Sequence, residues 1–484
     1  MTDTRTSSVT AVVILAAGAG TRMKSATAKV LHTLAGRSML HYAVDAANAV
    51  QPEHLVVVVG HQREQVIAHL AEIAPHAVTA VQEEQNGTGH AVQVGVAALP
   101  SATGTIVVIS GDVPLLTGET LTTLVEKHAA EGNAMTLLTS QPTDPTGYGR
   151  IVRDGDQCAR IVEQRDASPA ELLIGEINAG TYVFDGATLG AGLGELRTDN
   201  AQREVYLTDM VAWTRARGGR VVPWLLGDAW QAEGVNDRVQ LAAVGRELNT
   251  RLVEKWQRAG VTVVDPQTTW IHHDVDLAQD VTILPNTHLE GATSVESGAV
   301  IGPDTTLSDV EVGAGATVSR TQASLSVIGP KASVGPFAYL RPGTVLGENG
   351  KIGTFVETKN AKIAPEAKVP HLTYCGDAVI GEGVNIGAGT IFANYDGEHK
   401  HTSTVGNWSF VGSNTVLVAP VHIGDGVYVA AGSTVTSDVG PGELAVARGL
   451  QRNIPGWVAR KKAGSKTAAA AEAAQAAMQQ EGAE

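Results

Sequence analysis

A six-residue repeat in the second half of the chain constrains the fold more than any other feature. Large or branched aliphatic residues return at every sixth position in three separate runs, often with glycine next. The runs are Ile283, Leu289, Val295, Ile301 and Leu307; Ile328, Val334, Leu340, Leu346 and Ile352; and Val405, Val411, Leu417, Ile423, Val429 and Val435. A helix would spread these side chains around its axis, whereas a solenoid with three short strands per coil points every sixth residue into one interior column. The repeat therefore predicts a parallel β-helix over residues 261–460.

The repeat loses its phase at three places. The steps that six does not divide are 21, 28 and 19 residues long, from Leu307 to Ile328, from Ile352 to Ile380 and from Ile386 to Val405. We expect an inserted loop at each of them, because the surplus residues have no place in a regular coil. Loops inserted into a solenoid commonly form its binding site, and the polar segments 371–374 and 394–400 fall in the second and third breaks.

Length, charge and cysteine content restrict the class of protein. A chain of 484 residues exceeds what one core usually supports, so two or more domains are expected. The net charge of -15 argues against a nucleic-acid-binding protein, which needs a basic surface. Two cysteines, Cys158 and Cys375, are too few for a disulfide framework and lack a metal-ligand spacing.

The two ends of the chain carry no targeting signal or membrane span that the sequence can predict. No apolar run approaches the roughly 18 residues of a transmembrane helix, and residues 1–10 are short and polar. We therefore expect a cytoplasmic protein. Residues 461–484 are rich in Ala, Gln and Lys with few large apolar side chains, which predicts a disordered tail.

Residues 1–238 have the pattern of an α/β domain. Strand-like runs alternate with amphipathic helical stretches, which favours a mostly parallel sheet covered on both faces. The runs are 9–15, 55–59, 105–109 and 135–138. In such a sheet ligands bind beyond the carboxyl ends of the strands. Two segments stand there: 15–29, which begins Leu-Ala-Ala-Gly-Ala-Gly-Thr-Arg-Met, and 110–114, Ser-Gly-Asp-Val-Pro.

The first of these segments is a glycine-rich loop with two cations. Small residues such as Gly18 and Gly20 let backbone N–H groups approach a phosphate, and Arg22 and Lys29 add positive charge for a polyphosphate. A tight turn without a ligand explains a glycine-rich loop equally well. The loop is not a Walker sequence, because no Gly-Lys-Ser/Thr follows, and it is not a proper dinucleotide fingerprint.

Asp112 is the candidate metal ligand of the second segment. Carboxylate oxygen suits Mg²⁺, although a helix cap or turn is the better interpretation of an aspartate taken alone. The two segments and the strings around residues 82–90, 146–151, 175–180 and 232–237 together resemble the sugar-1-phosphate nucleotidylyltransferase family. Two positions depart from it: Ala28 stands where the family usually has Pro, and Ser110 where well-known members have Tyr.

This resemblance implies a Rossmann-like nucleotidyltransferase domain with Mg²⁺ held by Asp112 and Asn236. It places the following residues at the nucleotide and the sugar: Leu15, Ala16, Ala17, Gly18, Lys29, Gln82, Gly87, Thr88, Ser110, Gly111, Asp112, Gly149, Glu163, Asn178 and Asn236. Lys29 and Arg22 would neutralise charge at the reacting phosphate. The chemistry needs no protein nucleophile, because positioning and charge neutralisation suffice for phosphoryl transfer.

A single helix is predicted between the two halves, over residues 239–260. One apolar stripe recurs at intervals of three or four residues and ends before Gly260, a plausible helix stop. The stripe consists of Leu241, Val244, Leu248, Leu252 and Trp256. This helix is either a rigid arm that joins two domains or an element packed on the first.

Five further strings in the second half extend the resemblance to nearly the whole chain. They are Leu-Arg-Pro-Gly at 340–343, Phe-Val-Glu-Thr-Lys at 355–359, His-Leu-Thr-Tyr at 371–374, Asn-Ile-Gly-Ala-Gly at 385–389 and Asn-Tyr-Asp-Gly at 394–397. With them the chain resembles the bacterial bifunctional N-acetylglucosamine-1-phosphate uridyltransferase/glucosamine-1-phosphate N-acetyltransferase family, which makes UDP-N-acetylglucosamine for peptidoglycan and the cell envelope. The resemblance implies a left-handed β-helix, UTP and acetyl-CoA as substrates, and a homotrimer.

The resemblance also implies roles for residues of the second half. His371 would be the general base that accepts the proton of the sugar amine, with Glu357 holding its tautomer; histidine ordinarily titrates near neutral pH, which suits this task. The sugar phosphate would contact Arg341, Lys359, Tyr374 and Asn385. Acetyl-CoA would contact Ala388, Asn394, Tyr395, Ser413, Ala431 and Arg448.

Two other classes of protein remain as alternatives. In one, the β-helix only assembles or regulates a nucleotidylyltransferase, and His371 is a surface residue. In the other, the β-helix is a metal hydrolase with zinc on His399 and His401. A catalytic zinc requires three fixed protein ligands. The third candidate, His422, does not stand at a spacing typical of a zinc ligand.

Overall fold

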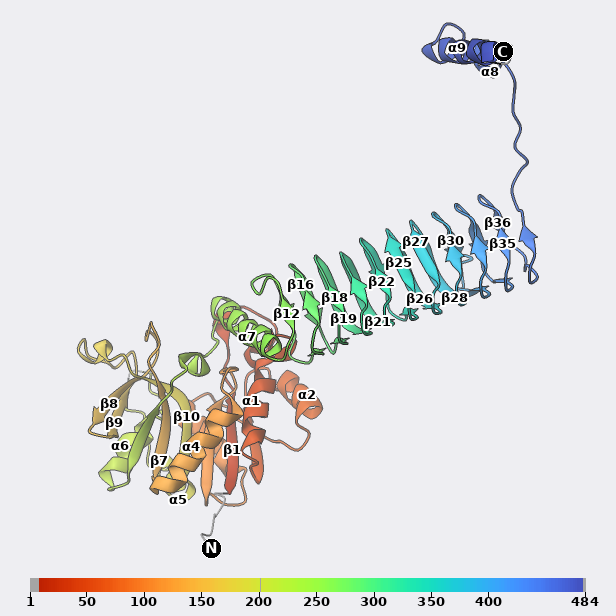
Figure 1. Ribbon diagram of the computed structural model, residues 1–484. Helices are drawn as coiled ribbons and strands as arrows, with labels where there is room; N and C mark the ends of the chain where they lie inside the picture. The colour runs from red at the N-terminus through yellow and green to blue at the C-terminus, as the bar shows by residue number, and fades with distance from the viewer. Residues whose placement is uncertain (1–7, 201, 482–484) are drawn as a thin grey trace. The chain divides into compact units, whose positions relative to one another are not determined.

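The computed structural model describes residues 8–200 and 202–481 (Figure 1). The predicted N-terminal polar segment, residues 1–10, therefore lies mostly outside the described residues. By its contacts the chain forms two compact units, Met1–Pro342 and Gly343–Glu484. The division falls inside the repeat region, so the boundaries expected at 238/239, 260/261 and 460/461 stay predictions. No helix in the described ranges is both long and apolar enough to cross a membrane.

The first unit begins with a mixed sheet in the order β11-β7-β10-β6-β1-β4-β5. Its strands are β1 (Val9–Ala16), β4 (His54–Val59), β5 (Val78–Val81), β6 (Thr105–Ser110), β7 (Met135–Ser140), β10 (Ile177–Asp185) and β11 (Val221–Leu225). The expected mostly parallel sheet is confirmed, with β10 antiparallel to β6 and β7. A hairpin of β8 (Arg150–Asp154) and β9 (Gln157–Val162) pairs beside β10.

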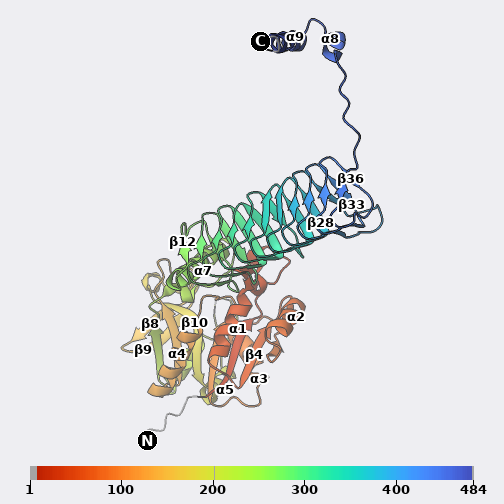
Figure 2. The same ribbon diagram turned by 45° about the vertical axis from the view of Figure 1, so that its right-hand side comes forward.

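Helices cover both faces of this sheet (Figure 2). They are α1 (Met39–Ala49), α2 (Arg63–Ile73), α3 (Thr88–Ala97), α4 (Gly118–Glu131), α5 (Gly186–Leu193) and α6 (Asp209–Ala216). One core packs α1, α2 and α4 against the sheet, and a second core packs α3, α5 and α6 against the opposite face. Alternate residues of β1 divide between the two cores: Val12 and Ile14 enter the first, Ala11 and Val13 the second. This burial on both faces explains why the strand sequences are apolar throughout.

The predicted connecting helix is α7 (Arg238–Arg258), and it is packed rather than free. Val244, Leu248 and Leu252 of its stripe lie in one cluster with Leu34 and Met39 of the first domain. The helix ends before Gly260, whose positive φ of 96° suits only glycine well. Of the two alternatives for this helix, the structure therefore shows the one in which it packs on the first domain.

Asn249 of α7 also ties the helix to the first coil of the repeat region. Its amide donates to the Thr269 carbonyl at 2.8 Å, and its side-chain oxygen accepts from the Ile271 N–H at 3.0 Å. The hairpin of β2 (Thr33–Leu34) and β3 (Arg37–Ser38) reaches the same coil, because the Arg37 guanidinium pairs with Asp274. The first domain, α7 and the first coil are thus connected by polar contacts as well as by the apolar stripe.

The coils of the first unit are stacks of short parallel strands, as the repeat predicts (Figure 1). They are β12 (Thr262–Val263), β13 (Trp270–Ile271), β14 (Asp276–Leu277), β15 (Thr282–Ile283), β16 (Thr287–Glu290), β17 (Ser294–Val295), β18 (Val300–Ile301), β19 (Thr305–Val312), β20 (Thr317–Val318), β21 (Thr321–Ile328), β22 (Ser333–Val334) and β23 (Ala338–Leu340). Ile283, Ile301, Val318 and Val334 face one another from coil to coil and are buried.

The strands of the second unit are likewise short and parallel. They are β24 (Val345–Leu346), β25 (Lys351–Thr354), β26 (Glu357–Ile363), β27 (Lys368–His371), β28 (Tyr374–Ile380), β29 (Asn385–Ile386), β30 (Ile391–Ala393), β31 (Ser403–Val405), β32 (Phe410–Val411), β33 (Val416–Val418), β34 (Val421–Ile423), β35 (Tyr428–Val429), β36 (Thr434–Val435) and β37 (Leu444–Ala445). Glycine after an interior residue lets neighbouring coils approach. A Cβ added at Gly387 would lie 2.5 Å from the Ser413 backbone nitrogen.

The expectation of an inserted loop is wrong at the first two phase breaks. Buried residues continue through both breaks, with some steps of five residues in place of six. They are Leu307, Val312, Val318, Ala323 and Ile328 in the first, and Ile352, Thr358, Ile363, Val369, Cys375 and Ile380 in the second. A residue with positive φ turns the chain at each short side, among them Asp309 (54°), Asn360 (44°) and Asp377 (48°). His371 therefore belongs to a regular coil.

The third break does hold an insertion. The chain leaves the coil after β30 and returns at β31, and the excursion is closed by a bridge between Tyr395 and Lys400. This is the one break of the three whose length the structure explains by extra residues.

The C-terminal segment differs from the disordered tail expected over 461–484. The structure has α8 (Trp457–Lys461) and α9 (Lys466–Glu481), and residues 482–484 lie outside the described residues. A run of alanines explains the helix, because alanine has the highest helix propensity. Of the described residues of α9 only Ala468 is buried, so tertiary packing, from which most helix stability in proteins comes, contributes little to this helix. Disorder of this segment in solution stays a prediction.

Replacing Val334 by Asp tests the interior column. Val334 is 3% exposed and faces Val318, so an unpaired carboxylate there would cost several kcal/mol. We expect a lower thermal midpoint and altered elution in size-exclusion chromatography. Val264→Asp is the matched control, because Val264 is 55% exposed and should change neither property. A Val334→Asp protein of native size and unchanged midpoint would show that the assigned column is incorrect.

Candidate active sites

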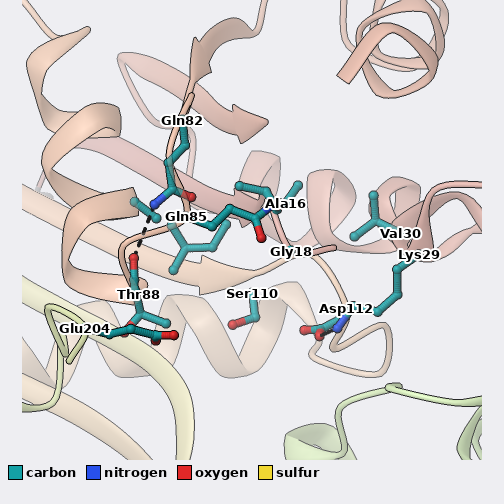
Figure 3. A pocket seen from close by; sticks show the side chains of 14 residues that line it. Ala16, Gly18, Lys29, Val30, Gln82, Gln85, Thr88, Ser110, Asp112 and Glu204 are labelled. Carbon is teal, nitrogen blue, oxygen red and sulfur yellow. Dashed lines mark hydrogen bonds and ion pairs between the residues drawn. The ribbon is translucent and has the colours of Figure 1, made fainter. Parts of the chain in front are cut away.

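An open cavity of about 300 Å³ lies at the carboxyl ends of β1 and β6 (Figure 3). Ten of the predicted nucleotide and sugar residues line it: Leu15, Ala16, Ala17, Gly18, Lys29, Gln82, Gly87, Thr88, Ser110 and Asp112. β1 and β6 are adjacent parallel strands, and they deliver the two predicted segments to one edge, as expected for such sheets. The volume is at the lower end of the range for pockets that bind small molecules.

The glycine-rich loop is held by contacts from three other parts of the first unit. The chain turns at Gly20 (φ 57°) into the short 3-10 helix η1 (Thr21–Met23), and the Arg238 guanidinium donates to the Met23 carbonyl at 3.1 Å. The Gln85 amide donates to the Ala17 carbonyl at 2.6 Å. Ala28 is buried, and its N–H donates to the Gln65 side chain at 3.1 Å. That hydrogen bond requires an N–H, which proline lacks.

Lys29, Asp112 and Asn236 form one polar group at the edge of the cavity. The Lys29 ammonium pairs with the Asp112 carboxylate and lies 3.3 Å from the Asn236 side-chain oxygen. The backbone also joins them, because the Val235 N–H donates to the Asp112 carbonyl at 2.9 Å. In Figure 3 the side chains of Lys29 and Asp112 point toward each other. Three residues from distant parts of the sequence thus meet, as the resemblance implied.

The donor set fits a magnesium ion. Asp112 and Asn236 each direct an oxygen at the same ammonium group, so their oxygens converge on one position that accepts a cation. One carboxylate and one amide oxygen, completed by waters and substrate phosphates, is a usual arrangement for Mg²⁺. No cluster of three or more His, Cys, Asp and Glu side chains suited to a metal occurs in the described part of the chain.

A second group gathers around β8, β9 and β10, outside the residues that line the cavity. The Asn178 N–H donates to the Gly149 carbonyl at 2.9 Å, and a Cβ at Gly149 would lie 3.5 Å from the Glu163 carboxylate. Burial raises the pKa of Glu163, although Thr208 donates to its carboxylate at 3.1 Å. Gly149, Glu163 and Asn178 therefore lie together. Gly111, whose N–H donates to the Leu15 carbonyl, and the exposed Arg22 also do not line the cavity.

Four lining residues were not predicted from the sequence: the apolar Val30 and Ala91, and the polar Gln85 and Glu204. Gln85 stands in the string that supplied Gln82 and Gly87, so its position was the available signal. Glu204 reaches the cavity because the Val205 N–H donates to the Asn86 carbonyl at 2.8 Å, which brings a distant loop alongside. Nothing in the local sequence of Glu204 indicates this pairing.

In the second unit, His371 and three predicted acetyl-CoA residues lie at one corner of successive coils. A ladder of backbone hydrogen bonds carries the alignment: Leu372 to Thr354, Gly389 to His371, Asn414 to Ala388 and Gly432 to Ser413. The residue after each corner position has a positive φ, which turns the chain there. These residues are Phe355, Leu372, Gly389, Asn414 and Gly432. His371, Ala388, Ser413 and Ala431 are thus stacked along the corner. A Cβ at Gly432 would lie 3.9 Å from the Arg448 side chain, so Arg448 is close to the same column.

A second set of predicted residues lies on the sheet that contains β26, β28 and β30. Glu357 faces Tyr374 in register, and Lys359 faces Gly376. The Asn394 amide is 3.4 Å from the Tyr374 hydroxyl. Tyr395 follows on the insertion, is 59% exposed, and donates from its hydroxyl to the Gly397 carbonyl. The structure therefore brings Lys359, Tyr374 and Asn394 to neighbouring coils.

Two predicted residues belong to other elements. Asn385 is exposed on β29, in the other sheet of the unit, where it pairs with Lys368 and Phe410. Arg341 belongs to the first unit, where its carbonyl is 3.4 Å from the Ser326 hydroxyl. The orienting role of Glu357 toward His371 stays a prediction.

The histidines of the zinc alternative have other partners. His401 pairs with the Asp396 carboxylate at 2.7 Å, and the His399 N–H donates to the same side chain at 2.7 Å. Backbone hydrogen bonds and His401 hold the pKa of Asp396 far below its usual range. These contacts close the hairpin of the insertion and account for the three residues as elements of a turn.

Comparison with known proteins finds relatives over nearly the whole chain. Residues 12–173 match the MobA-like NTP transferase domain family. The protein named Bifunctional protein GlmU of Streptomyces coelicolor is 56% identical over 466 residues, which cover 96% of this chain and 97% of that protein. The proteins of the same name from Mycolicibacterium gilvum and Corynebacterium aurimucosum are 57% and 54% identical; each alignment covers 96% of this chain, and 94% and 96% of the respective relatives.

Proposed function

Because the chain belongs to the family of the bifunctional protein GlmU, it is a uridyltransferase and an acetyltransferase, and we propose how its residues divide the two reactions. The cavity at β1 and β6 is assigned uridylyl transfer from UTP to N-acetylglucosamine 1-phosphate. The corner that carries His371 is assigned acetyl transfer from acetyl-CoA to glucosamine 1-phosphate. The observation that supports this division most strongly is the stacking of His371, Ala388 and Ser413 at one corner.

In uridylyl transfer, a phosphate oxygen of the sugar attacks the α-phosphorus of UTP, the bond to the β-phosphate oxygen breaks, and pyrophosphate leaves. Mg²⁺, when bound, neutralises charge on the triphosphate; Asp112 and Asn236 would hold it. Lys29 lies beside both residues and supplies a second cation near the transferred phosphate. The backbone N–H groups of the loop at Ala17 and Gly18 position the nucleotide.

In acetyl transfer, the sugar amine attacks the thioester carbonyl, the carbon–sulfur bond breaks, and the coenzyme leaves as its thiol. The amine must lose a proton as the new bond forms, and we assign its acceptance to His371. Lys359 and Tyr374 bind the sugar phosphate, and Ala388, Ser413 and Ala431 line the extended coenzyme. Acetylation comes first, because its product is the substrate of the N-terminal site.

We further propose that the acetyl-transfer site is completed by a second copy of the chain. Asn385 lies on the sheet that contains β27 and β29, whereas Lys359 and Tyr374 lie on the sheet that contains β26 and β28. Side chains on adjacent outer faces of a coil point apart, so one chain does not bring them to one ligand. A homotrimer, as the family resemblance implies, would supply the missing face. Light scattering coupled to size-exclusion chromatography measures the assembly directly.

A single assay separates the proposal from its two alternatives. Thiol release from acetyl-CoA that depends on glucosamine 1-phosphate is expected only of an acetyltransferase. A regulatory β-helix and a zinc hydrolase both predict none, and only the hydrolase predicts activity lost with a zinc chelator. A cytoplasmic location agrees with these phosphorylated substrates and remains part of the proposal.

Asp112→Ala tests the metal assignment. Without this carboxylate the metal and the Lys29 ammonium both lose a partner, so pyrophosphate release from UTP and N-acetylglucosamine 1-phosphate should fall to background. Acetyl transfer by the same preparation should persist, because Asp112 belongs to the other unit. Near wild-type pyrophosphate release from the variant would reject the assignment.

His371→Ala tests the general base. The binding residues remain, so both substrates should still bind, and the loss should appear in kcat, about 10²- to 10⁴-fold. The two half-reactions should be measured separately across pH, with uridylyl transfer as the internal control. Acetyl transfer within a few-fold of wild type would exclude His371 as the base, and an equal fall in both activities would indicate misfolding.

A further inference from the structure

A line of polar side chains crosses three successive coils of the second unit. Successive members of the set Asn360, Asp377 and Asn394 are 17 residues apart along the chain, and the strand registers place them at the same corner. The Asn360 amide donates to Asp377 Oδ1 at 2.9 Å, and the Asn394 amide donates to Asp377 Oδ2 at 2.5 Å. Both carboxylate oxygens of Asp377 therefore accept a hydrogen bond, one from the coil on each side.

Asp377 is a buried charge with a definite set of partners. It is 8% exposed, and the Lys359 ammonium lies 4.0 Å from Oδ2. Burial alone would raise the pKa of Asp377, but the hydrogen bonds from Asn360 and Asn394, with Lys359 and Lys400 nearby, hold it below its usual range. The side chain is therefore an anion at neutral pH, and a buried anion fixes the donors that compensate it.

This anion determines which way the Asn394 amide faces. A carboxylate only accepts hydrogen bonds, so the NH₂ group of Asn394 must point toward Asp377 and its carbonyl oxygen must point away. The same NH₂ group lies 3.4 Å from the Tyr374 hydroxyl. Asn394 is 6% exposed, which leaves little freedom for another rotamer. The Asn394 oxygen thus becomes an acceptor with a fixed direction.

Two of the partners of Asp377, Lys359 and Asn394, are residues assigned to ligands. Lys359 is assigned to the sugar phosphate and Asn394 to acetyl-CoA, and Asn394 in turn lies 3.4 Å from the hydroxyl of Tyr374, which is also assigned to the sugar phosphate. Asp377 itself is not among the residues assigned to either ligand. One residue thus connects the two binding regions of the acetyl-transfer site.

We propose that Asp377 is a positioning residue of the acetyl-transfer site, which orients the amide of Asn394 and holds the ammonium of Lys359 for the two substrates. The inference rests on the proposed function. In this inference Asp377 contacts neither ligand and keeps the two substrate-binding regions in one arrangement.

Asp377→Asn in the full-length protein is the test. The substitution keeps the shape but removes the charge and one fixed acceptor. We expect kcat/KM of acetyl transfer to fall about 10- to 100-fold, as small displacements of binding groups do, with higher KM for both glucosamine 1-phosphate and acetyl-CoA. The pH profile of kcat should not change, since His371 is untouched. Uridylyl transfer and the thermal midpoint should remain near wild type.

The double variant Asn360→Asp/Asp377→Asn is the matched control. It restores the carboxylate with the same composition and net charge, but one coil farther from Asn394. If position matters, acetyl transfer should stay low. Recovery by the double variant, or a single variant within threefold of wild type, would overturn the inference. A joint fall of both activities and of the thermal midpoint would assign Asp377 a structural role instead. Absence of acetyl transfer by the wild-type chain would overturn the proposed function and this inference with it.

Discussion

The hydrogen bonds between parallel coils determine most of what this protein presents to its ligands. Strands of neighbouring coils lie about 4.8 Å apart, so a side chain at one corner meets its equivalent in the next coil at a fixed spacing. His371 and Ala388 are aligned in this way by the bond from Gly389 to the His371 carbonyl. An extended ligand that runs along the stack therefore meets one residue per coil, and the backbone determines the separation of those residues.

In the first domain a parallel sheet, rather than a stack of coils, determines where the ligand-binding segments lie. Its strands are parallel where the glycine-rich loop and Asp112 leave the sheet, so both segments arrive at one edge. The contacts that complete the group come from α7 and the segment before it: Asn236 lies near Lys29, and Arg238 donates to Met23. The helix that begins the connection to the coils thus also supports the loop. A truncation within α7 would remove part of this support along with the second half of the chain.

The sequence predicted the architecture well because its signals are periodic. Runs such as Ile283 to Leu307 identify the solenoid, and β1, β4, β6 and β7 coincide with the predicted strands. The inserted loops were wrong at two breaks because the prediction assumed a fixed side length of six. A residue such as Asn360 or Asp377 in the left-handed region turns the chain one residue earlier. Asparagine and aspartate adopt that conformation more readily than most residues, and this was the available signal.

Individual site residues were predictable only where motif and neighbourhood coincide. Asp112 follows a buried strand, so its place at the sheet edge could be inferred from the sequence. Asn236 was assigned from the family resemblance alone, since its approach to Lys29 depends on how the chain returns from β11. Glu204 was missed because the hydrogen bond that brings its loop to the cavity, from the Val205 N–H to the Asn86 carbonyl, joins segments distant in sequence. Asp377 was missed because its partner Asn394 belongs to another coil.

The variable side length of the coils has a consequence for how such a chain can change. Coils from Ile283 to Ile301, from Ile301 to Val318 and from Val318 to Val334 contain 18, 17 and 16 residues, yet their interior residues remain aligned. A single-residue deletion at a corner therefore need not shift the residues that follow, provided that the corner residue accepts the left-handed conformation. Descendants of one ancestral coil can differ in length while their active-site columns stay in line. Aligning the coils by their interior residues would then reveal relationships that an alignment at a fixed interval of six residues misses.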